Sequence, residues 1–479
     1  MKKSLRIILS VALVLALSIS LYFIIKGRDR GDGQPSYSFI NDVNLEEFSI
    51  VYSASDLDYS KRAAEYIHTE ILSRTGLDLP LVLDSKAKGE HEIVVGNTKR
   101  DISHTLDAPT TGLEFAILAE GGSVALEGDY FVIAAAAYFF IDTYVPNDDF
   151  RATIPQEVKI HEPIVKEAKN FILLIGDGMG VNQTRLFEYL ANTCDYSDGE
   201  ELFYGYMLPY MGFSRTDSLS DTTDSTAGGT ALWVTTDSAA GGTALSSGTK
   251  TIIGYVGIDK NKQDLLLLPE LFGSLGKASA VMSTETQTGA TPSSFSAHAD
   301  NRDNSADIIL SQQNTTKQYG TIIDCGYNYY TKHQLAQIET HITNTLEKVA
   351  ADQDGFFLMY EEAHIDKHCH DNDMDKTFLA LMRFNQAIAR FMEFAFYHPD
   401  TFVLITADHE TGTLLEGDDG ELHYNSKEHS SANVPVFAYG DGAELFDGKT
   451  IENIQIAHTI ASFVGVTDFG DQSEFQYLK

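Results

Sequence analysis

The sequence predicts an α/β protein built on a doubly wound, mostly parallel sheet, with a small α/β domain and a membrane segment ahead of it. Two observations predict the main sheet. Four apolar runs, each suited to a buried parallel strand, alternate with stretches of helical apolar spacing. Three of these runs are followed within two residues by a carboxylate, and parallel sheets bind their ligands at the carboxyl ends of strands.

Length and composition limit the classes of function. The chain has 479 residues, for which two folded domains are expected, and its 43% apolar and 22% charged residues are ordinary for globular proteins. A formal net charge of −35 argues against nucleic acid and anionic membrane surfaces as partners. An anionic substrate would therefore need local positive charge from metal ions or a few placed cations. Three cysteines, Cys194, Cys325 and Cys369, allow one disulfide at most.

Residues 1–36 are read as a targeting segment and a linker. Three basic residues precede an apolar run at residues 7–25, and three more follow it. The run is just long enough to span a bilayer, and neither a small-residue cleavage site nor a cysteine for lipidation follows it. We therefore expect an uncleaved membrane anchor, and a cleaved signal peptide of a secreted protein is the alternative. Either places the body of the chain outside the cytoplasm.

Residues 37–165 are predicted to form a small accessory α/β domain. The expected elements are strands at residues 48–52, 79–83 and 92–95, helices at 61–75 and 131–145, and a hairpin at 115–127. The pattern resembles the small α/β domain ahead of the catalytic domain in some bacterial glycoside hydrolases, which implies contact with a glycan. A structural spacer without a ligand is the alternative.

Residues 166–479 hold the strand–helix alternation of the main sheet. The apolar runs lie at residues 171–176, 278–282, 355–360 and 401–406. The helical stretches lie at residues 182–192, 265–275, 333–350, 378–397 and 454–463. Strands that alternate with helices in this way predict a parallel sheet whose carboxyl ends share one edge.

Carboxylates and imidazoles gather at the predicted strand ends and shortly after them. They are Asp177, Glu361, Asp366, His370, Asp408, His409 and His429. If these groups converge they need cations, and neutral imidazole with carboxylate is the ligand set of zinc. An oxygen-rich subset, Asp177 and Glu361 with a hydroxyl, suits magnesium. Each residue alone has an ordinary explanation as a cap or a solvated side chain, but together they indicate a metal centre.

Residues 235–250, TTDSAAGGTALSSGTK, predict a turn that places Ser238 at the start of a helix. Asp237 precedes the serine, small residues continue the helix, and Gly248 ends it. The N-terminus of a helix favours an anion, so a phosphoryl group could be held on Ser238. An Asp-Ser pair in this position is by itself more often an ordinary helix cap.

Six motifs in unbroken order between residues 168 and 465 resemble the alkaline phosphatase family. They are GDGMG at 176–180, TDSAAGGTALSSGTK at 236–250, ATPSSFSAHADNR at 290–302, EEAHIDKHCH at 361–370, TADHETG at 406–412 and H-x4-VPVFAYG from His429. The resemblance implies the sheet of that family, metal-dependent hydrolysis of phosphate monoesters, and a homodimer.

The resemblance also implies a role for each site residue. Ser238 matches the nucleophile that becomes phosphoserine, Arg302 matches the arginine that clamps the phosphate, and Asp237 matches the carboxylate that orients this arginine. Two Zn²⁺ ions and one Mg²⁺ ion are implied. Their expected ligands are Asp366, His370 and His429 for the first zinc, Asp177, Asp408 and His409 for the second, and Asp177, Thr291 and Glu361 for magnesium.

Two positions near the predicted magnesium site need comment. Gly289 stands where the family usually carries Asp or His, a residue that supports magnesium. We therefore expect altered metal affinity, and we expect the substitution Gly289→Asp to tighten the site. Lys367 matches a variant in which a lysine reaches phosphate through water, and a surface lysine is the alternative.

A tandem repeat supplies two candidate nucleophiles. TTDSTAGGTALWV at residues 222–234 is followed by TTDSAAGGTALSS at 235–247, so Ser225 and Ser238 stand in the same local sequence. The residues after Ser238 match the family without a break, which favours Ser238. Residues 222–234 are then expected to form a surface loop or an extended lead-in to the helix, with Trp233 packed against a neighbouring surface.

The expected activity is that of an alkaline phosphatase. A phosphodiesterase or sulfatase of the same superfamily is one alternative, and a glycan-binding scaffold with an impaired phosphatase domain is another. Arg302 and the context of the serine favour monoesters. The complete set of ligand residues argues against the scaffold.

Overall fold

The computed structural model describes residues 38–53, 58–104, 112–146, 149–191, 202–224, 230–327, 332–418 and 420–479. Their contacts divide the chain into two compact units, of which the first ends at Pro163 and the second begins at Ile164. The predicted membrane segment at residues 7–25 and the serine Ser225 lie outside the described residues. Within the described ranges, no helix is both long enough and apolar enough to cross a membrane.

The first unit folds around a six-stranded mixed sheet in the order β4-β3-β5-β7-β6-β9. Its strands are β3 (Phe48–Tyr52), β4 (Leu81–Leu83), β5 (His91–Val95), β6 (Phe115–Glu120), β7 (Ser123–Glu127) and β9 (Glu157–Ile160). The helices α2 (Tyr59–Thr75) and α3 (Ile133–Tyr144) pack on this sheet and on each other. The predicted hairpin is confirmed, because Gly121 and Gly122 have φ angles of 60° and 80° and turn β6 back along β7.

A smaller sheet in the order β2-β1-β8 completes the first unit. Its strands are β1 (Phe39–Ile40), β2 (Val43–Asn44) and β8 (Arg151–Ala152). β1 pairs in parallel with β8, so the start of the described part of this unit is joined by backbone hydrogen bonds to the segment that precedes β9.

The second unit is built on an eight-stranded sheet in the order β15-β14-β16-β10-β17-β22-β11-β23. The strands are β10 (Asn170–Gly176), β11 (Tyr210–Arg215), β14 (Ala278–Ser283), β15 (Ile322–Cys325), β16 (Phe356–Glu362), β17 (Thr401–Thr406), β22 (Val434–Tyr439) and β23 (Thr450–Glu452). The sheet is mostly parallel, as predicted, but β22 runs antiparallel to both of its neighbours, β17 and β11. The apolar runs in the sequence predicted only β10, β14, β16 and β17 of this sheet, so neither β22 nor its reversed direction was predicted.

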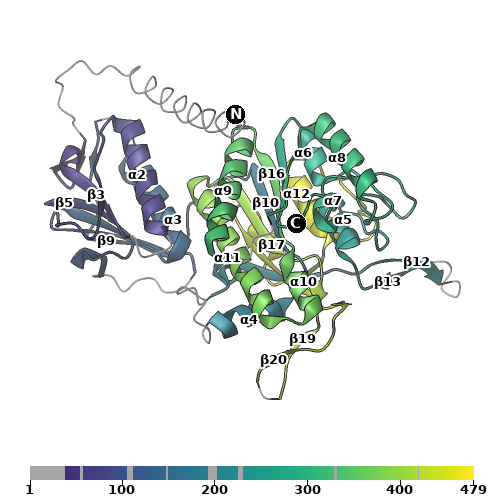
Figure 1. Cartoon of the computed structure of the whole chain (residues 1–479). Helices are drawn as coiled ribbons and strands as arrows, with labels where there is room; N and C mark the ends of the chain where they lie inside the picture. Colours follow the sequence, from purple (N-terminus) through teal and green to yellow (C-terminus); the bar gives the residue numbers. More distant parts are fainter. Residues whose placement is uncertain are drawn as a thin grey trace, which may run out of the picture. The chain divides into compact units, whose positions relative to one another are not determined.

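Helices cover both faces of this sheet, as a doubly wound fold requires (Figure 1). One face carries α4 (Val181–Ala191), α9 (Lys332–Val349) and α11 (Met374–Tyr397), and the other carries α5 (Ser238–Ser247), α6 (Leu268–Ser274) and α12 (Ile454–Phe463). The helix α8 (Ser305–Tyr319), which was not predicted, packs on α6. Alternate residues of β10, including Phe171 and Leu173, join Phe272 of α6 and Ile460 of α12 in the main hydrophobic core.

The register of β10 sets the position of the predicted site. β10 is buried along its whole length and pairs in parallel with β16 and β17. Ile175 therefore lies opposite both Glu361 and Thr406. The residues that follow these positions leave the sheet at the same edge, where α10 (His364–Asp371) begins directly after β16.

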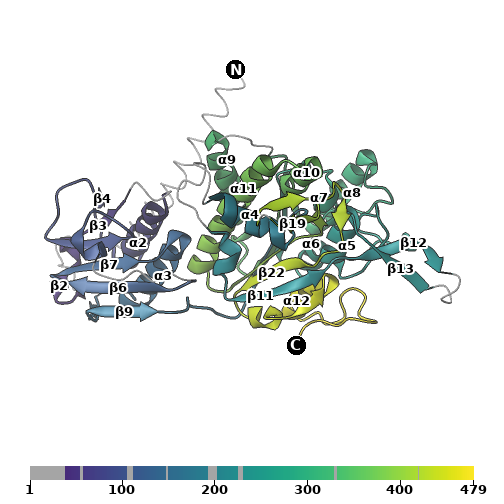
Figure 2. The ribbon, with the colours of Figure 1, turned by 90° about the horizontal axis from the view of Figure 1, so that it is seen from below.

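The two copies of the tandem repeat adopt different structures. The second copy opens α5, whereas the described residues of the first belong to an antiparallel hairpin of β12 (Ser218–Asp224) and β13 (Thr230–Val234). This hairpin projects from the second unit (Figures 1 and 2). Trp233 is less packed than predicted, since 49% of its surface is exposed and the Lys250 ammonium lies 5.7 Å from its ring centroid.

Candidate active site

Carboxylates predicted at the strand ends are brought together at one edge of the main sheet. Asp177 follows β10, Glu361 lies near the end of β16, and Asp408 and His409 follow β17. All four side chains are buried. Burial of several carboxylates in one place costs free energy unless cations or hydrogen bonds compensate for it.

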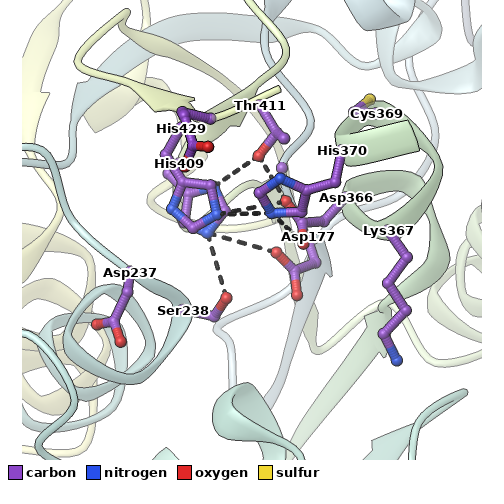
Figure 3. A network of polar contacts seen from close by, with 12 residues as sticks. Asp177, Asp237, Ser238, Asp366, Lys367, Cys369, His370, His409, Thr411 and His429 are labelled. Atoms are coloured by element: carbon purple, nitrogen blue, oxygen red, sulfur yellow. Dashed lines mark hydrogen bonds and ion pairs between the residues drawn. The ribbon is translucent and has the colours of Figure 1, made fainter. Parts of the chain in front are cut away.

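Ser238 lies in the first turn of α5, as predicted, and faces this cluster (Figure 3). Asp237 caps the helix, because its Oδ1 accepts a hydrogen bond of 2.9 Å from the Ala240 N–H. The buried Ser238 Oγ lies 3.2 Å from His409 Nε2. The serine oxygen is thus placed where the N–H groups and the dipole of the helix favour negative charge.

Three imidazoles direct their Nε2 atoms into one space (Figure 3). His370 Nε2 lies 3.1 Å from His429 Nε2, and the rings of His409 and His429 stack with centroids 3.6 Å apart. His370 and His429 each direct Nδ1 at a backbone carbonyl oxygen, and His409 directs Nδ1 at the Thr411 hydroxyl. A carbonyl only accepts hydrogen bonds, so Nδ1 carries the proton in the neutral forms of His370 and His429, and Nε2 of the neutral ring has the lone pair that a metal would take. Burial lowers the pKa of His409 to about 4 and keeps this ring neutral.

Two groups of side chains have ligand atoms close enough together to hold one metal ion each. The members are Asp366, His409 and His429 in one group and Asp177, Asp408 and His409 in the other, and within a group all these atoms lie within 4.8 Å of one another. The second group is the set predicted for the second zinc. The first contains Asp366 and His429 of the predicted first zinc set. The remaining member of that set, His370, lies at the same centre, with Nε2 3.3 Å from Asp366 Oδ2.

Four buried oxygen atoms of the site make no hydrogen bond of good geometry with the described residues, although Thr291 lies near Glu361 and His409 Nε2 lies 3.6 Å from Asp177 Oδ1 and 3.3 Å from Asp408 Oδ2. They are Asp177 Oδ1, Thr291 Oγ1, Glu361 Oε1 and Asp408 Oδ2. An unpaired buried polar atom costs about 1–3 kcal/mol, and such atoms are rare in folded proteins. Three of the four belong to the predicted magnesium ligands. The donors therefore fit cations, with oxygen ligands for magnesium and mixed nitrogen and oxygen ligands for zinc.

The pKa values of the buried carboxyl groups reflect the same crowding of negative charge. Burial and the charges of Asp408 and Asp366 raise the pKa of Asp177 well above its usual range. Burial and the charge of Glu285 raise the pKa of Glu361 to about 8. Burial, with the charge of Asp366, raises the pKa of Asp408 to about 6. A bound cation would replace this mutual repulsion with attraction.

Asp366 and His370 lie four residues apart on one face of α10, as predicted, and form a charged pair. Burial opposes ionisation of Asp366, but hydrogen bonds from His370 and Thr411 and the nearby imidazoles lower its pKa below the usual range. The hydrogen bond to Asp366 raises the pKa of His370 to about 9. In the metal-free protein, a proton of the His370 ring therefore lies between His370 and Asp366, at the place where a bound cation would lie.

Asp237 also holds Arg302 next to the start of α5. Arg302 Nη1 donates to Asp237 Oδ2 at 2.9 Å, and the Gly254 N–H donates to the same oxygen at 3.1 Å. One third of the Arg302 side chain is exposed, so the anchored guanidinium also borders on solvent. This placement gives Ser238 a fixed cationic neighbour, with Asp237 orienting Arg302 as the family resemblance implied.

Some contacts of the site were not predicted. Thr411 Oγ1 donates to Asp366 Oδ1 at 2.5 Å, and the only signal in the sequence was its place two residues after His409 in TADHETG. Lys367 Nζ lies 2.5 Å from Glu285 Oε1, so this lysine pairs with a carboxylate. Its ammonium points away from the three imidazoles (Figure 3). Glu285 carried no motif signal, because its position depends on how the chain turns after β14.

The pKa of His370 gives a test of this geometry. In the metal-free protein His370 should titrate near pH 9, and Asp366→Asn should bring its pKa down towards the ordinary value of about 6.5. Because the folded pKa lies above the ordinary value, protonation of His370 stabilises the metal-free fold fully below about pH 6.5, and this stability is lost as pH rises through about 9. NMR titration of the imidazole protons measures both variants.

The control for this titration is Asp371→Asn, which removes an exposed carboxylate from the same helix. It should leave the pKa of His370 where it is in the wild type. An equal drop in both variants would mean that general negative charge, and not the hydrogen bond that His370 donates to Asp366, holds the proton on His370.

Comparisons with known proteins place this site in a family. A family model described as alkaline phosphatase matches residues 168–329 and 331–421. Alkaline phosphatase 3 of Bacillus subtilis (strain 168) is 28% identical over 339 residues, which cover 60% of this chain and 70% of that protein. Alkaline phosphatase 4 of the same organism is 26% identical over 345 residues, covering 60% of this chain and 71% of that one.

Solved structures agree at the level of the fold. The alkaline phosphatase of the Antarctic bacterium TAB5 superposes with a TM-score of 0.52 and 24% identity, covering 62% of this chain and 98% of that one. The Thermus thermophilus alkaline phosphatase superposes with a TM-score of 0.52 and 15% identity, covering 63% and 92%. The family model covers more than half of the sequence. It includes all the predicted site residues except His429, which lies after the matched residues. The chain therefore belongs to the alkaline phosphatase family, and it is a phosphatase.

Proposed function

We propose that this chain hydrolyses phosphate monoesters through a phosphoserine on Ser238, at a centre for two zinc ions and one magnesium ion. The observation that carries the proposal is the place of Ser238 Oγ, 3.2 Å from His409 Nε2 and at the N-terminus of α5. The serine thus lies between the ligand groups on one side and the Asp237–Arg302 pair on the other.

Three sets of residues would hold the metals. They are Asp366, His370 and His429 for one zinc, Asp177, Asp408 and His409 for the other, and Asp177, Thr291 and Glu361 for magnesium. When bound, these ions would neutralise the buried carboxylates, lower the pKa of oxygen atoms in the centre and stabilise negative charge on the attacking and leaving oxygens.

The residues of the chain itself divide the reaction into two displacements. Ser238 Oγ attacks phosphorus, the bond from phosphorus to the ester oxygen breaks, and the alcohol leaves. Water then attacks the phosphoserine, which releases inorganic phosphate and restores the serine hydroxyl. Arg302 grips phosphoryl oxygens through its planar guanidinium, and Asp237 prevents this group from swinging away.

Charge selects the substrate class. A monoester presents a dianionic phosphoryl group with free oxygens for the guanidinium, the helix N-terminus and the metal centre. A diester blocks one of these oxygens with a second substituent, and a sulfate ester carries one negative charge less. The fixed position of Arg302 beside Ser238 therefore supports monoesters as the substrates.

Hydrolysis of three matched aryl esters tests the proposal. With the metal-loaded full chain, turnover of an aryl phosphate should exceed that of the corresponding diester and sulfate by at least about 100-fold, because the other esters lose contacts at Arg302 and the helix. Metal analysis should find two zinc ions and one magnesium ion per chain. A chelator should remove the activity, and zinc with magnesium should restore it.

Two outcomes of this comparison would contradict the proposal. Preference for the diester or the sulfate would support the corresponding alternative activity within the superfamily. A purified chain that holds no metal and hydrolyses none of the three esters would support a scaffold role.

The two serines of the repeat form a matched pair of variants. Ser238→Ala should lower turnover by about a thousand-fold or more, because it removes the atom that forms the covalent intermediate. Ser225→Ala removes the same hydroxyl from the same local sequence and should leave turnover unchanged. Acid quenching during turnover, followed by peptide mapping, should find phosphate on Ser238. An inactive Ser225→Ala variant, or half the activity in each variant, would contradict the assignment of Ser238 as the sole nucleophile.

We further propose that residues 7–25 anchor the chain in a membrane with its body outside the cytoplasm, and the length of the apolar run supports the anchor. Basic residues flank the run on both sides, so they do not decide its orientation. In fractionated cells the full chain should sediment with membranes, and removal of residues 1–36 should make it soluble. Release of the full chain into the medium would favour a cleaved signal peptide, and a soluble cytoplasmic form would contradict both. The homodimer and the glycan contact of the first unit stay predictions.

A further inference from the structure

We propose that Glu285 supplies, from a different position in the chain, the carboxylate that the magnesium side of the site lacks at Gly289, and that Lys367 holds it there. This inference rests on the proposed function, because it assigns a supporting group to the magnesium set of Asp177, Thr291 and Glu361. Glu285 is argued to act as a positioning residue, beside the magnesium ligands.

Glu285 leaves the sheet next to Glu361. β14 and β16 pair in parallel with Ser283 opposite Glu361, and Glu285 stands two residues after Ser283. The Glu285 N–H donates to Ser283 Oγ at 2.9 Å, and the same hydroxyl donates to the Glu361 carboxylate. One serine therefore ties the backbone of Glu285 to a predicted magnesium ligand.

The Glu285 side chain fills the space that a side chain at position 289 would use. A Cβ atom added to Gly289 would lie 2.5 Å from Glu285 Oε2 and 2.8 Å from Glu285 Cγ and Cδ, closer than real Cβ atoms approach. Gly289 caps the short helix that holds Thr291, two residues further on. The Glu285 carboxylate thus lies against the segment of a second predicted magnesium ligand.

Lys367 fixes the other oxygen of this carboxylate. Its Nζ lies 2.5 Å from Glu285 Oε1, whereas Oε2 is the oxygen nearest to Gly289. Lys367 follows the predicted zinc ligand Asp366 on α10, so the pair joins the magnesium side of the site to the zinc side. The charge of Glu285 also acts on Glu361 and Asp177, whose pKa values it helps to raise.

This arrangement leads to an expectation for Gly289→Asp that differs from the one that the sequence alone suggested. An aspartate at 289 would have to displace the Glu285 carboxylate and would add a second negative charge beside it. The single substitution should therefore fail to tighten magnesium binding. Removal of the Glu285 side chain would open the space, and the new aspartate could then take over the pairing with Lys367.

Magnesium titrations of the zinc-loaded full chain test whether Glu285 takes the place of a carboxylate at position 289. The probe is Mg²⁺ alone, measured by calorimetry and by the rise in Tm that it causes, so the readout does not depend on turnover. Glu285→Gln should weaken magnesium binding by about 10-fold, the size of effect typical of groups that support metal ligands. Gly289→Asp should bind magnesium no more tightly than the wild type. The double variant Glu285→Ala with Gly289→Asp should recover most of the affinity that Glu285→Gln loses.

The control is Glu416→Gln, which breaks an ion pair of the second unit between Glu416 and Arg185 at 2.7 Å and should leave magnesium binding unchanged. Wild-type affinity in Glu285→Gln, or tighter binding in Gly289→Asp alone, would overturn this inference while the wild type still hydrolyses monoesters. The inference would also be overturned if Gly289→Asp restored no magnesium affinity to the Glu285→Ala variant. A wild type that binds no magnesium would overturn it together with the three-metal part of the proposed function.

Discussion

Buried negative charge at one edge of the main sheet is the constraint on which the second unit depends. Asp177, Glu361 and Asp408 leave neighbouring strands whose parallel register is fixed by backbone hydrogen bonds, so they have no freedom to move apart. Their pKa values are all raised, which means that the fold holds the ionised forms at a cost in free energy. Cations that bind the folded chain and not the unfolded one would reverse this cost, so the metal centre should serve stability as well as chemistry.

The same constraint shapes how an acidic chain can receive an anionic substrate. With a net charge of −35, the chain as a whole repels a phosphate ester, so attraction has to be local. Asp237 organises much of it, because one carboxylate caps α5, anchors Arg302 and accepts the Gly254 N–H. The cation at Arg302 and the helix N-terminus therefore keep a fixed relation to Ser238, and the metal ions would supply the rest of the positive charge.

The sequence predicted those parts of the molecule whose signal is local. The apolar run at residues 171–176 predicted the strand β10, and the carboxylate after the run predicted that Asp177 lies at the strand end. Both predictions were possible because burial and strand ends can be read from consecutive residues. The strand β22 was not predicted, and its direction could not be read in this way either, since an apolar strand looks the same in either orientation. Glu285 was not predicted as a site residue for a different reason. Its role depends on contacts between separate segments, because its carboxylate fills the space beside Gly289 and pairs with Lys367, 82 residues further along the chain.

The tandem repeat shows how packing at a distance decides between identical motifs. With the offset of 13 residues, Trp233 of the first copy corresponds to Ser246 of the second. Ser246 is fully buried in α5, and its hydroxyl donates to the Ser294 carbonyl at 2.6 Å. A tryptophan there would overfill the core and leave this carbonyl without its serine donor, a change that costs several kcal/mol in well-packed interiors. In the hairpin, by contrast, the tryptophan ring keeps half of its surface in solvent. The far end of α5, and not the Asp-Ser pair at its start, therefore favours the copy that brings Ser238 to the site.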